Sequence, residues 1–386
     1  MTPAARVQAA IELLDRIAAG QAAEQALTSW GRSARYAGSK DRAAVRDLVF
    51  DALRCWRSTA ALGGGETGRA RLLGLLRLRE EDPAQVFTGQ GHAPAPLEAE
   101  ELAAGQAPHG AAALDLPDWL APRFRDSLGP EADATALALR SRAEVFLRVN
   151  LLRATPETAM ARLGQDGILA EPHELSATAL RVTEGARRIM RSGAYLDGLV
   201  ELQDAASQAV VDLLPLEPGM QVLDYCAGGG GKALAMAARM RGGPVVAHDA
   251  APKRMVDLPA RASRAGADVR IASRPKGDFD LVLCDVPCSG SGAWRRAPEG
   301  KWRLTEERLD ELCGIQADIL DRAAGYVVKG GVLAYATCSV LAEENAKQVS
   351  AFLERRPGWS VEEQRQFLPG SGGDGFFAAV LRRTAT

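Results

Sequence analysis

The sequence predicts an α/β protein: a doubly wound, mainly parallel sheet at the C-terminal end, preceded by a small mixed α+β domain and an all-helical domain. Three observations predict it. From residue 205 on, short continuous apolar runs alternate with helical patterns, which is typical of a parallel sheet covered on both faces. Residues 143–204 mix strand-like and helical pieces, and residues 1–80 show only helical periodicity.

Composition limits the class of protein. The chain has 386 residues with 47% hydrophobic and 25% charged, which predicts two or three globular domains. Its 47 basic and 49 acidic residues give a net charge of −2, which excludes a uniformly basic coat but not a local basic patch. No apolar run approaches the ~20 residues of a membrane span, and the first residues lack the apolar core of a signal peptide. The few cysteines lie late in the chain, so we expect a cytoplasmic protein with reduced thiols and no membrane partner.

The first 80 residues form the predicted helical domain and carry a net charge of +5. One helix is indicated by the spacing of Val7, Ala10, Ile11, Leu14 and Ile17. A second, behind a possible cap at Ser39, is indicated by Val45, Leu48, Val49, Ala52, Leu53 and Trp56. Its outer face carries Arg42, Arg46 and Arg54, which suit either a solvated helix face or a surface facing RNA.

Residues 81–142 are expected to connect the domains. Within them, residues 81–120 have no Lys or Arg and seven acidic residues, and they are rich in Ala, Pro and Gly. This composition predicts a linker, although a helix around Leu97–Ala104 is an alternative. The small α+β domain at 143–204 begins with the strand-like AEVFLRVNLLR, and its arginines predict a basic surface.

Residues 205–386 carry the predicted doubly wound sheet. Its strands are expected at Val222–Leu223, Val245–Ala247, Val269–Ala272, Leu281–Cys284 and Val332–Ala336. The C-terminal FFAAVLRR is expected to add a last strand, with an antiparallel direction as one possibility.

A glycine loop joins the first of these strands to a helix in the run QVLDYCAGGGGKALAMAARM. A P-loop is disfavoured because Cys226 stands at the first glycine position and Ala233 at the hydroxyl position, and the glycines do not fit GxGxxG. S-adenosylmethionine suits an acidic strand end, a glycine loop and a ribose-binding acid, which Asp224, Gly228–Gly231 and Asp249 supply. A tight strand-to-helix turn without a ligand is the alternative.

Two cysteines each follow an apolar strand directly. Asp285 and Cys288 follow FDLVLC, and Cys338 follows GGVLAYAT, so all three are expected at the sheet edge that carries the glycine loop. Each cysteine alone would be read as a small buried hydrophobic residue. No CxxC occurs and the four histidines have no ligand spacing, so we expect no metal.

Two cysteines and an acid beside a methyl donor suit methylation of cytosine at carbon 5. That carbon is a poor nucleophile until a thiolate adds at carbon 6. The acid can supply a proton to ring nitrogen 3 during this addition. A base must later remove the proton on carbon 5, and a second cysteine can assist release of the thiol.

The motifs resemble the RsmB–Nop–Sun family of RNA cytosine carbon-5 methyltransferases over residues 143–386. The matching segments are LRVN, ELQDAASQ, LDYCAGGGGK, VVAHDAAPKRM, DLVLCDVPCSGSGAWRRAPEGKW, ATCSVLAEEN and the GFF of 375–377. The resemblance implies a class I, Rossmann-like methyltransferase fold for the doubly wound sheet. More weakly, GSKDRAAVRDLVFDALR resembles the NusB-like RNA-binding domain of bacterial RsmB-type enzymes.

The resemblance also implies roles for individual residues. Cys338 would be the nucleophile, Cys288 would promote breakdown of the adduct, and Asp285 would contact the cytosine beside the methyl donor. S-adenosyl-L-methionine would be held by Asp285, by Asp249 at its ribose, and by Cys226, Ala227, Gly228, Gly229, Gly230, Gly231 and Lys232. The RNA side of the cleft would be lined by Arg296, Pro298, Lys301 and Trp302.

The chain departs from the family pattern at two places. The family loop reads Ala-Pro-Gly-Gly-Lys, whereas Gly228 and Gly229 stand at the Ala-Pro positions here, which predicts a more flexible loop. The acid that follows the third strand is replaced by Ala272 and Ser273, which puts the adenine contact in doubt.

The resulting hypothesis is a monomeric RNA cytosine carbon-5 methyltransferase that acts on 16S rRNA or an assembling small subunit. One alternative keeps this chemistry and takes transfer RNA as substrate. A second is an RNA-binding or ribosome-assembly factor that has kept the fold and lost most of its catalytic activity.

Overall fold

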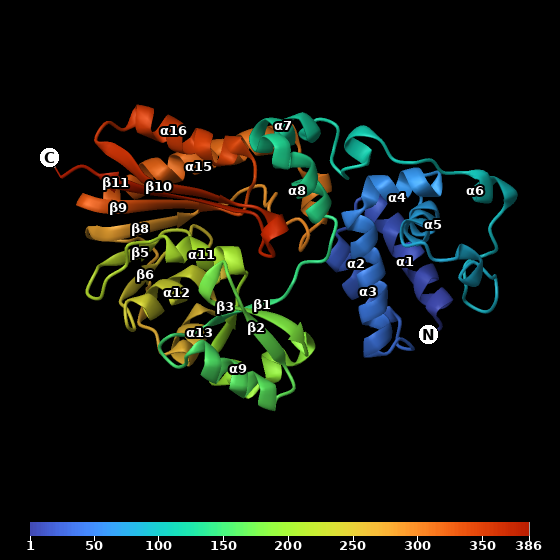
Figure 1. The fold of residues 1–386 in the computed structure, drawn as a ribbon, viewed down its shortest axis with the longest axis horizontal. Helices are drawn as coiled ribbons and strands as arrows, with labels where there is room; N and C mark the ends of the chain where they lie inside the picture. The colour runs from blue at the N-terminus through green and yellow to red at the C-terminus, as the bar shows by residue number, and fades with distance from the viewer. Residues whose placement is uncertain (386) are drawn as a thin grey trace. The chain divides into compact units, whose positions relative to one another are not determined.

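The structure is a computed structural model that describes residues 1–385 and divides into two compact units. The first unit contains Met1–Arg142 and Trp294–Leu304, and the second contains Ala143–Ala293 and Thr305–Thr386 (Figure 1). The chain therefore leaves the second unit once, contributes one segment to the first, and returns.

The first unit is helical. Its helices before residue 81 are α1 (Pro3–Ala18), α2 (Ala23–Ser33), α3 (Ser39–Arg54), α4 (Trp56–Gly63) and α5 (Gly68–Leu78). The five apolar residues that predict the first helix are all buried in α1, whose amino end is capped by the Thr2 hydroxyl. They share one hydrophobic core with α2, α3 and α5.

The second predicted helix differs from α3 in two details. Gly38, not Ser39, is the residue before the helix, and the Asp41 carboxylate accepts the Gly38 amide at 3.2 Å. Arg54 is only 6% exposed, so its assignment to a solvated or RNA-facing surface is wrong. Its guanidinium donates to the Arg295 carbonyl and to Asp51, both at 2.7 Å, because burial of a charge requires such partners.

Residues 81–142 contain η1 (Pro83–Gln85), α6 (Ala99–Ala103), η2 (Gly110–Ala112), α7 (Leu120–Leu128), η3 (Gly129–Glu131) and α8 (Ala132–Ala138). The short α6 lies inside the alternative helix expected around 97–104. The inserted segment carries α14 (Glu299–Arg303) and begins with Trp294, which stacks on Phe124 at 6.0 Å between ring centroids. This unit therefore takes part of its core from residues far along the chain.

The second unit begins with a four-stranded antiparallel sheet in the order β2-β3-β1-β4. Its elements are β1 (Phe146–Val149), α9 (Pro156–Gln165), β2 (Leu169–His173), β3 (Ser176–Glu184), η4 (Ala186–Arg191), α10 (Gly193–Leu196) and β4 (Val200–Leu202). Asn150 follows β1 and donates its amide to the carbonyls of Gly198 and Ala265, both at 2.8 Å. The small sheet is thereby connected to the helix that ends at Ala265, beside the larger sheet.

The seven-stranded sheet has the order β10-β11-β9-β8-β5-β6-β7. The five strands from β9 to β7 are parallel, and β11 runs antiparallel to both of its neighbours, β9 and β10. The strands are β5 (Val222–Asp224), β6 (Val245–Ala247), β7 (Val269–Ile271), β8 (Phe279–Asp285), β9 (Val327–Thr337), β10 (Trp359–Phe367) and β11 (Phe376–Arg383). The predicted doubly wound α/β fold is confirmed, and its order reverses between β5 and β8, where such sheets bind ligands.

Helices cover both faces of this sheet (Figure 1). On one face, α11 (Ala205–Asp212) and α12 (Gly231–Arg239) share a core with the strands, and α13 (Leu258–Ala265) packs beside α12. On the other lie α15 (Glu306–Ala323) and α16 (Ala346–Arg355). The short η5 (Pro252–Met255), η6 (Ala324–Tyr326), η7 (Ala342–Glu344) and η8 (Pro369–Ser371) complete the unit.

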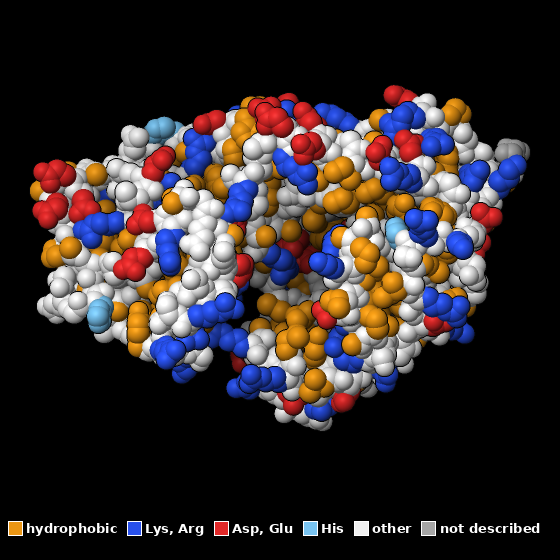
Figure 2. Space-filling view, turned by 180° about the vertical axis from the view of Figure 1, so that it is seen from behind, with side chains coloured by type: hydrophobic (Ala, Val, Ile, Leu, Met, Phe, Trp, Pro, Cys, Tyr) orange, Lys and Arg blue, Asp and Glu red, His pale blue; other side chains and the backbone are white. Residues whose placement is uncertain are grey.

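The surface agrees with the near-zero net charge. Figure 2 shows basic and acidic side chains interspersed over the visible face, with no continuous basic coat there. Among residues 1–385, no helix combines the length and the apolar character that crossing a bilayer requires.

Candidate active site

The glycine loop lies between β5 and α12, at the point where the strand order reverses. Gly228 (φ +51°) and Gly230 (φ +80°) adopt left-handed conformations, which favour glycine. At Gly230 a side chain is also excluded by space, because an added Cβ would lie 2.1 Å from Leu258 Cδ1. The sharp turn brings the backbone into α12, whose first free N–H groups face this end of the sheet.

Asp249, the predicted ribose-binding acid, holds the loop from the neighbouring strand β6. One carboxylate oxygen accepts the Gly228 amide at 2.9 Å, and the other accepts the Ala251 amide at 2.8 Å. Arg254 lies 3.2 Å from the same carboxylate. A carboxylate offers about four acceptor positions, so Asp249 keeps capacity for a ribose hydroxyl, and that role stays a prediction.

Lys232 and Asp285 form an ion pair between the loop helix and the end of β8. Lys232 Nζ donates to Asp285 Oδ2 at 2.7 Å, and Lys232 also lies 5.0 Å above the Phe376 ring. The Lys232 side chain is buried, whereas about a third of the Asp285 side chain is exposed. The partly exposed Asp285 carboxylate therefore lies at the strand ends, and the buried Lys232 ammonium group balances its charge.

Asp224 is a buried acid whose two carboxylate oxygens have no hydrogen-bond partner among the described residues. It is 1% exposed, and burial, followed by the nearby Asp285 charge, raises its pKa to about 7. An unpaired buried carboxylate beside a glycine loop would be stabilised by a cation such as an ammonium group. Asp224 thus fits a ligand that carries positive charge, whereas Asp249 and Asp285 already face Arg254 and Lys232.

Cys226, also in the loop, stays a thiol because burial, followed by the charge of Asp224, raises its pKa. At the end of β7, Ala272 and Ser273 stand where the family has an acid. The Ala272 carbonyl lies 3.0 Å from His248 Nδ1.

The two predicted cysteines lie together. Cys288 follows β8 and Cys338 follows β9, the two strands are parallel neighbours, and the sulfur atoms are 3.4 Å apart. Neither Cys288 nor Cys338 forms a disulfide bond. The hydrogen bond with Cys338, followed by burial, raises the pKa of the Cys288 thiol well above its usual range. Cys288 therefore keeps its proton more readily than an ordinary thiol.

Glu344 fixes both cysteine loops and was not predicted. Its carboxylate is fully buried and accepts hydrogen bonds from the Ser289 amide at 2.7 Å and from the hydroxyls of Ser289 and Ser339. Gln316 of α15 donates to it at 3.0 Å. Each of these serines directly follows one of the cysteines, so one acid sets the distance between the two sulfur atoms. The only sequence feature that could have indicated Glu344 is the pair of acidic residues in VLAEEN, shortly after Cys338.

The segment predicted to line an RNA cleft lies in the first unit. Lys301 is 1% exposed and donates to the Arg54 carbonyl at 3.4 Å, and burial lowers its pKa to about 8. Arg296 is exposed. Lys301 therefore does not face solvent in this structure, and RNA contact by Arg296 and Lys301 stays a prediction.

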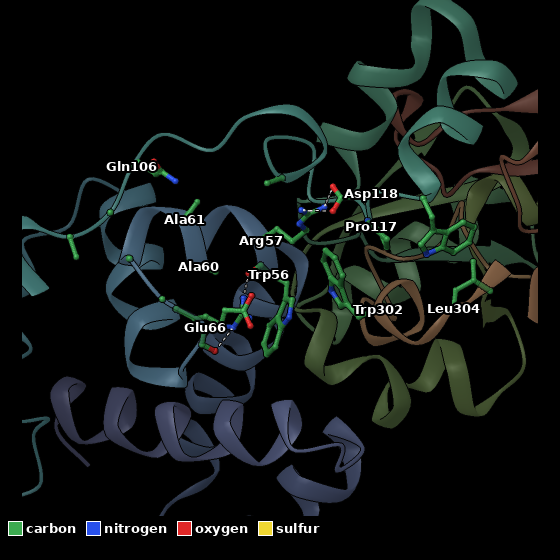
Figure 3. A pocket seen from close by; sticks show the side chains of 17 residues that line it. Trp56, Arg57, Ala60, Ala61, Glu66, Gln106, Pro117, Asp118, Trp302 and Leu304 are labelled. Carbon is green, nitrogen blue, oxygen red and sulfur yellow. Dashed lines mark hydrogen bonds and ion pairs between the residues drawn. The ribbon is translucent and has the colours of Figure 1, made fainter.

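Trp302 belongs to a pocket within the first unit. Its indole donates to the Leu53 carbonyl at 2.7 Å and lines, with Trp56, Arg57 and Trp119, a cavity of about 870 Å³ (Figure 3). Arg57 is ion-paired with Asp118 at the same pocket. This pocket contains none of the predicted catalytic or cofactor residues.

Comparisons with known proteins agree with the geometry. A family model described as 16S rRNA methyltransferase RsmB/F matches residues 211–382. A second, described as the ferredoxin-like domain of RsmF/B-like methyltransferases, matches residues 116–187.

Similar curated proteins are named ribosomal RNA small subunit methyltransferase B. The chain is 36% identical over 282 residues to ribosomal RNA small subunit methyltransferase B of Serratia proteamaculans, and 34% identical to the protein so named in Citrobacter koseri. Each match covers 69% of this chain, and the chain spans 66% of the length of these relatives.

Solved structures share the fold. The crystal structure of PH0851 matches with a TM-score of 0.75 at 23% identity and covers 99% of both chains. A methyltransferase homologue from Pyrococcus horikoshii matches with a TM-score of 0.63 at 24% identity, over 71% of this chain and 97% of that one. NSun6 from the same organism, solved with SFG, matches with a TM-score of 0.63 at 18% identity, over 70% and 99%. With two RsmB/F family models and relatives above 30% identity, the chain belongs to the RsmB/F family of methyltransferases.

Proposed function

We propose that this protein transfers a methyl group from S-adenosyl-L-methionine to carbon 5 of a cytosine in small-subunit ribosomal RNA. The observation that carries the proposal is the pair of sulfur atoms 3.4 Å apart, one beyond the strand that ends in Asp285 and the other beyond its parallel neighbour. Family membership supports the substrate class, because the curated relatives are named as ribosomal RNA small subunit methyltransferases. The protein acts as a monomer in this proposal.

The three acids and the glycine loop would hold the cofactor. Asp224 would pair with the ammonium group of its methionine part, because that carboxylate is buried and unpaired among the described residues. Asp249 would hold the ribose, and the loop from Cys226 to Lys232 would follow the rest of the molecule. When bound, the cofactor supplies an electrophilic methyl group on a positively charged sulfur.

The residues of the chain would carry the remaining steps. The Cys338 thiol gives its proton to solvent and its sulfur forms a bond to carbon 6, while the π electrons of the carbon 5–carbon 6 double bond move to carbon 5. At the same time the Asp285 carboxylate takes a proton from its ion-pair partner Lys232, 2.7 Å away, and passes a proton to ring nitrogen 3. After methyl transfer, solvent takes the proton on carbon 5, and the electron pair of that C–H bond restores the carbon 5–carbon 6 double bond. The bond from carbon 6 to the Cys338 sulfur then breaks, and Cys288 assists this release.

Bisulfite mapping of total RNA from cells with and without the protein tests the proposal. We expect one protected cytosine in small-subunit RNA that disappears when the protein is absent or carries Cys338→Ala. Protection of a transfer RNA site would replace the substrate and keep the chemistry. Unchanged maps in all three samples, together with normal ribosome content, would overturn the enzymatic proposal.

A further inference from the structure

The glycine loop lacks the proline of its family and is held by arginines instead. We propose that Arg261, itself fixed by Glu201 of the small sheet, is a positioning residue that takes over the rigidifying role of the missing proline. This inference rests on the proposed function for the identity of the cofactor, S-adenosylmethionine. It makes cofactor affinity depend on residues that do not touch the cofactor.

The contacts connect the loop to the small sheet within the second unit. Arg261, on α13, donates to the Gly229 carbonyl and, at 3.1 Å, to the Glu201 carboxylate. Glu201 lies on β4, is 2% exposed, and also pairs with Arg264. A guanidinium can bridge a carbonyl and a carboxylate because its donors have a fixed planar geometry. Arg261 thus connects one loop carbonyl to a buried charge on another sheet.

A second arginine supports the end of the same loop. Arg148 of β1 donates to the Gly231 carbonyl and to Gln203. Residues Arg148 and Glu201 are register partners on neighbouring strands of the small sheet. The contact of Arg148 with the loop and the Glu201 carboxylate that fixes Arg261 therefore lie at neighbouring positions of that sheet.

The glycines and the arginines are complementary in space. A Cβ added at Gly229 would lie 3.1 Å from Arg261 Nη1, and one at Gly228 would lie 3.1 Å from Arg254 Nη2. Both distances are tighter than ordinary van der Waals contact, and a proline ring would extend further than a Cβ. The Ala-Pro pair of the family and the arginine contacts of this chain therefore compete for the same space.

The energetic reason is loop entropy. Glycine at a position where the family has proline leaves the loop more conformations to lose when it takes its binding shape. A contact that holds one loop carbonyl raises the fraction of molecules with the binding-competent shape, and apparent affinity rises with that fraction. Arg261 can supply this restriction only while Gly229 leaves it room.

Calorimetry with S-adenosylmethionine on the full chain tests the affinity. Arg261→Ala should weaken binding about tenfold if the competent fraction falls to about one tenth. The matched control is Arg264→Ala, which removes the other Glu201 partner but no loop contact, and it should bind within about twofold of the parent. Equal affinity of Arg261→Ala and the parent would overturn the proposal.

Gly229→Pro sharpens the test because its effect should reverse sign. In the parent chain it should weaken binding by displacing Arg261, whereas in the Arg261→Ala background it should strengthen binding by restoring the restriction. A simple structural role of Arg261 predicts no such reversal, and additive effects of the two substitutions would contradict the competition.

Hydrogen exchange of amides 226–231 without any ligand separates this inference from the proposed function. Arg261→Ala should speed exchange of these amides, and Arg264→Ala should not. If the parent fails to bind S-adenosylmethionine, the cofactor assignment is wrong, and the exchange rates still decide whether Arg261 restrains the loop. Equal exchange in all three proteins would overturn the inference.

Discussion

The cysteine loops and the glycine loop both follow strands of one sheet, yet they are held by different kinds of neighbours. The cysteine loops are fixed by Ser289, Ser339 and Glu344, which lie within six residues of a cysteine. The glycine loop is fixed by Arg261, 32 residues away from its contact, and by Arg148, 83 residues away. The Cys338 loop is therefore fixed from within its own segment, and the same acid reaches the Cys288 loop across 55 residues. The glycine loop depends instead on side chains from another helix and another sheet.

The largest effect on activity is expected from a substitution in the cysteine site itself. Cys338→Ala should abolish methyl transfer, because no thiolate remains to activate carbon 5. Incorporation of labelled methyl groups into RNA measures it, with binding of S-adenosylmethionine as the control for folding. Turnover at the parent rate would remove Cys338 as nucleophile.

Cys288→Ala should stall the reaction after bond formation. We expect a protein–RNA adduct that survives on a denaturing gel, because release of Cys338 loses its assisting group. Cys313→Ala, a half-buried cysteine beside the Glu343 carbonyl, is the matched control and should leave no adduct. Normal turnover of the Cys288 variant without an adduct would contradict its role in release.

Glu344→Gln tests whether the local network positions the sulfur atoms. The amide has one accepting oxygen where the carboxylate has two, so either the two serine hydroxyls or the Ser289 amide and Gln316 lose their acceptor. We therefore expect kcat to fall about ten- to a hundredfold. Unfolding in urea should show a loss of about 1–3 kcal/mol, because buried donors lose a charged acceptor. A stability loss with unchanged kcat would restrict Glu344 to a structural role.

Asp224 provides a test by stability alone, on the glycine-loop side of the comparison. Its pKa of about 7 in the folded protein lies above the ordinary value near 3.8. The folded state therefore binds this proton more tightly than the unfolded state, and the stabilisation is complete below about pH 4 and is lost as pH rises through 7. The full effect is at most about 4 kcal/mol.

Urea unfolding at a series of pH values measures this effect. The free energy of unfolding of the parent without cofactor should fall between pH 4 and 7 more steeply than that of Asp224→Asn. Parallel curves would show that Asp224 does not titrate in this range. Saturating S-adenosylmethionine should lower the pKa of Asp224 and so reduce the difference in slope.

Much of the fold could be predicted because its strands are short, apolar and buried. Val222–Leu223 and the four other predicted runs all coincide with parallel strands, with Ala272 one residue beyond the end of β7. Strand β10 was missed because most of WSVEEQRQF is exposed at the edge of the sheet and shows no apolar pattern. Arg54 was misplaced because its partner Arg295 lies 241 residues away, and helical periodicity carries no information about such a contact.

The same distinction applies to the candidate site. The positions of Cys288 and Cys338 at neighbouring strand ends follow from sheet topology, which sequence patterns reveal. Glu344 and Arg261 act through side-chain contacts between elements, and only the folded structure brings their partners together. The unpaired state of Asp224 likewise depends on what packs around it, not on its place after an apolar strand.

The excursion of Trp294–Leu304 into the first unit determines how this protein can be divided. A cut between Arg142 and Ala143 would not give two complete parts, because the C-terminal fragment would carry Trp294 without Phe124 to cover it. The helical fragment would lose the Arg295 carbonyl that accepts from Arg54 and would keep a buried guanidinium short of a partner. Both fragments should therefore aggregate more readily than the intact chain, and supplying the eleven-residue piece as a peptide should protect the N-terminal one.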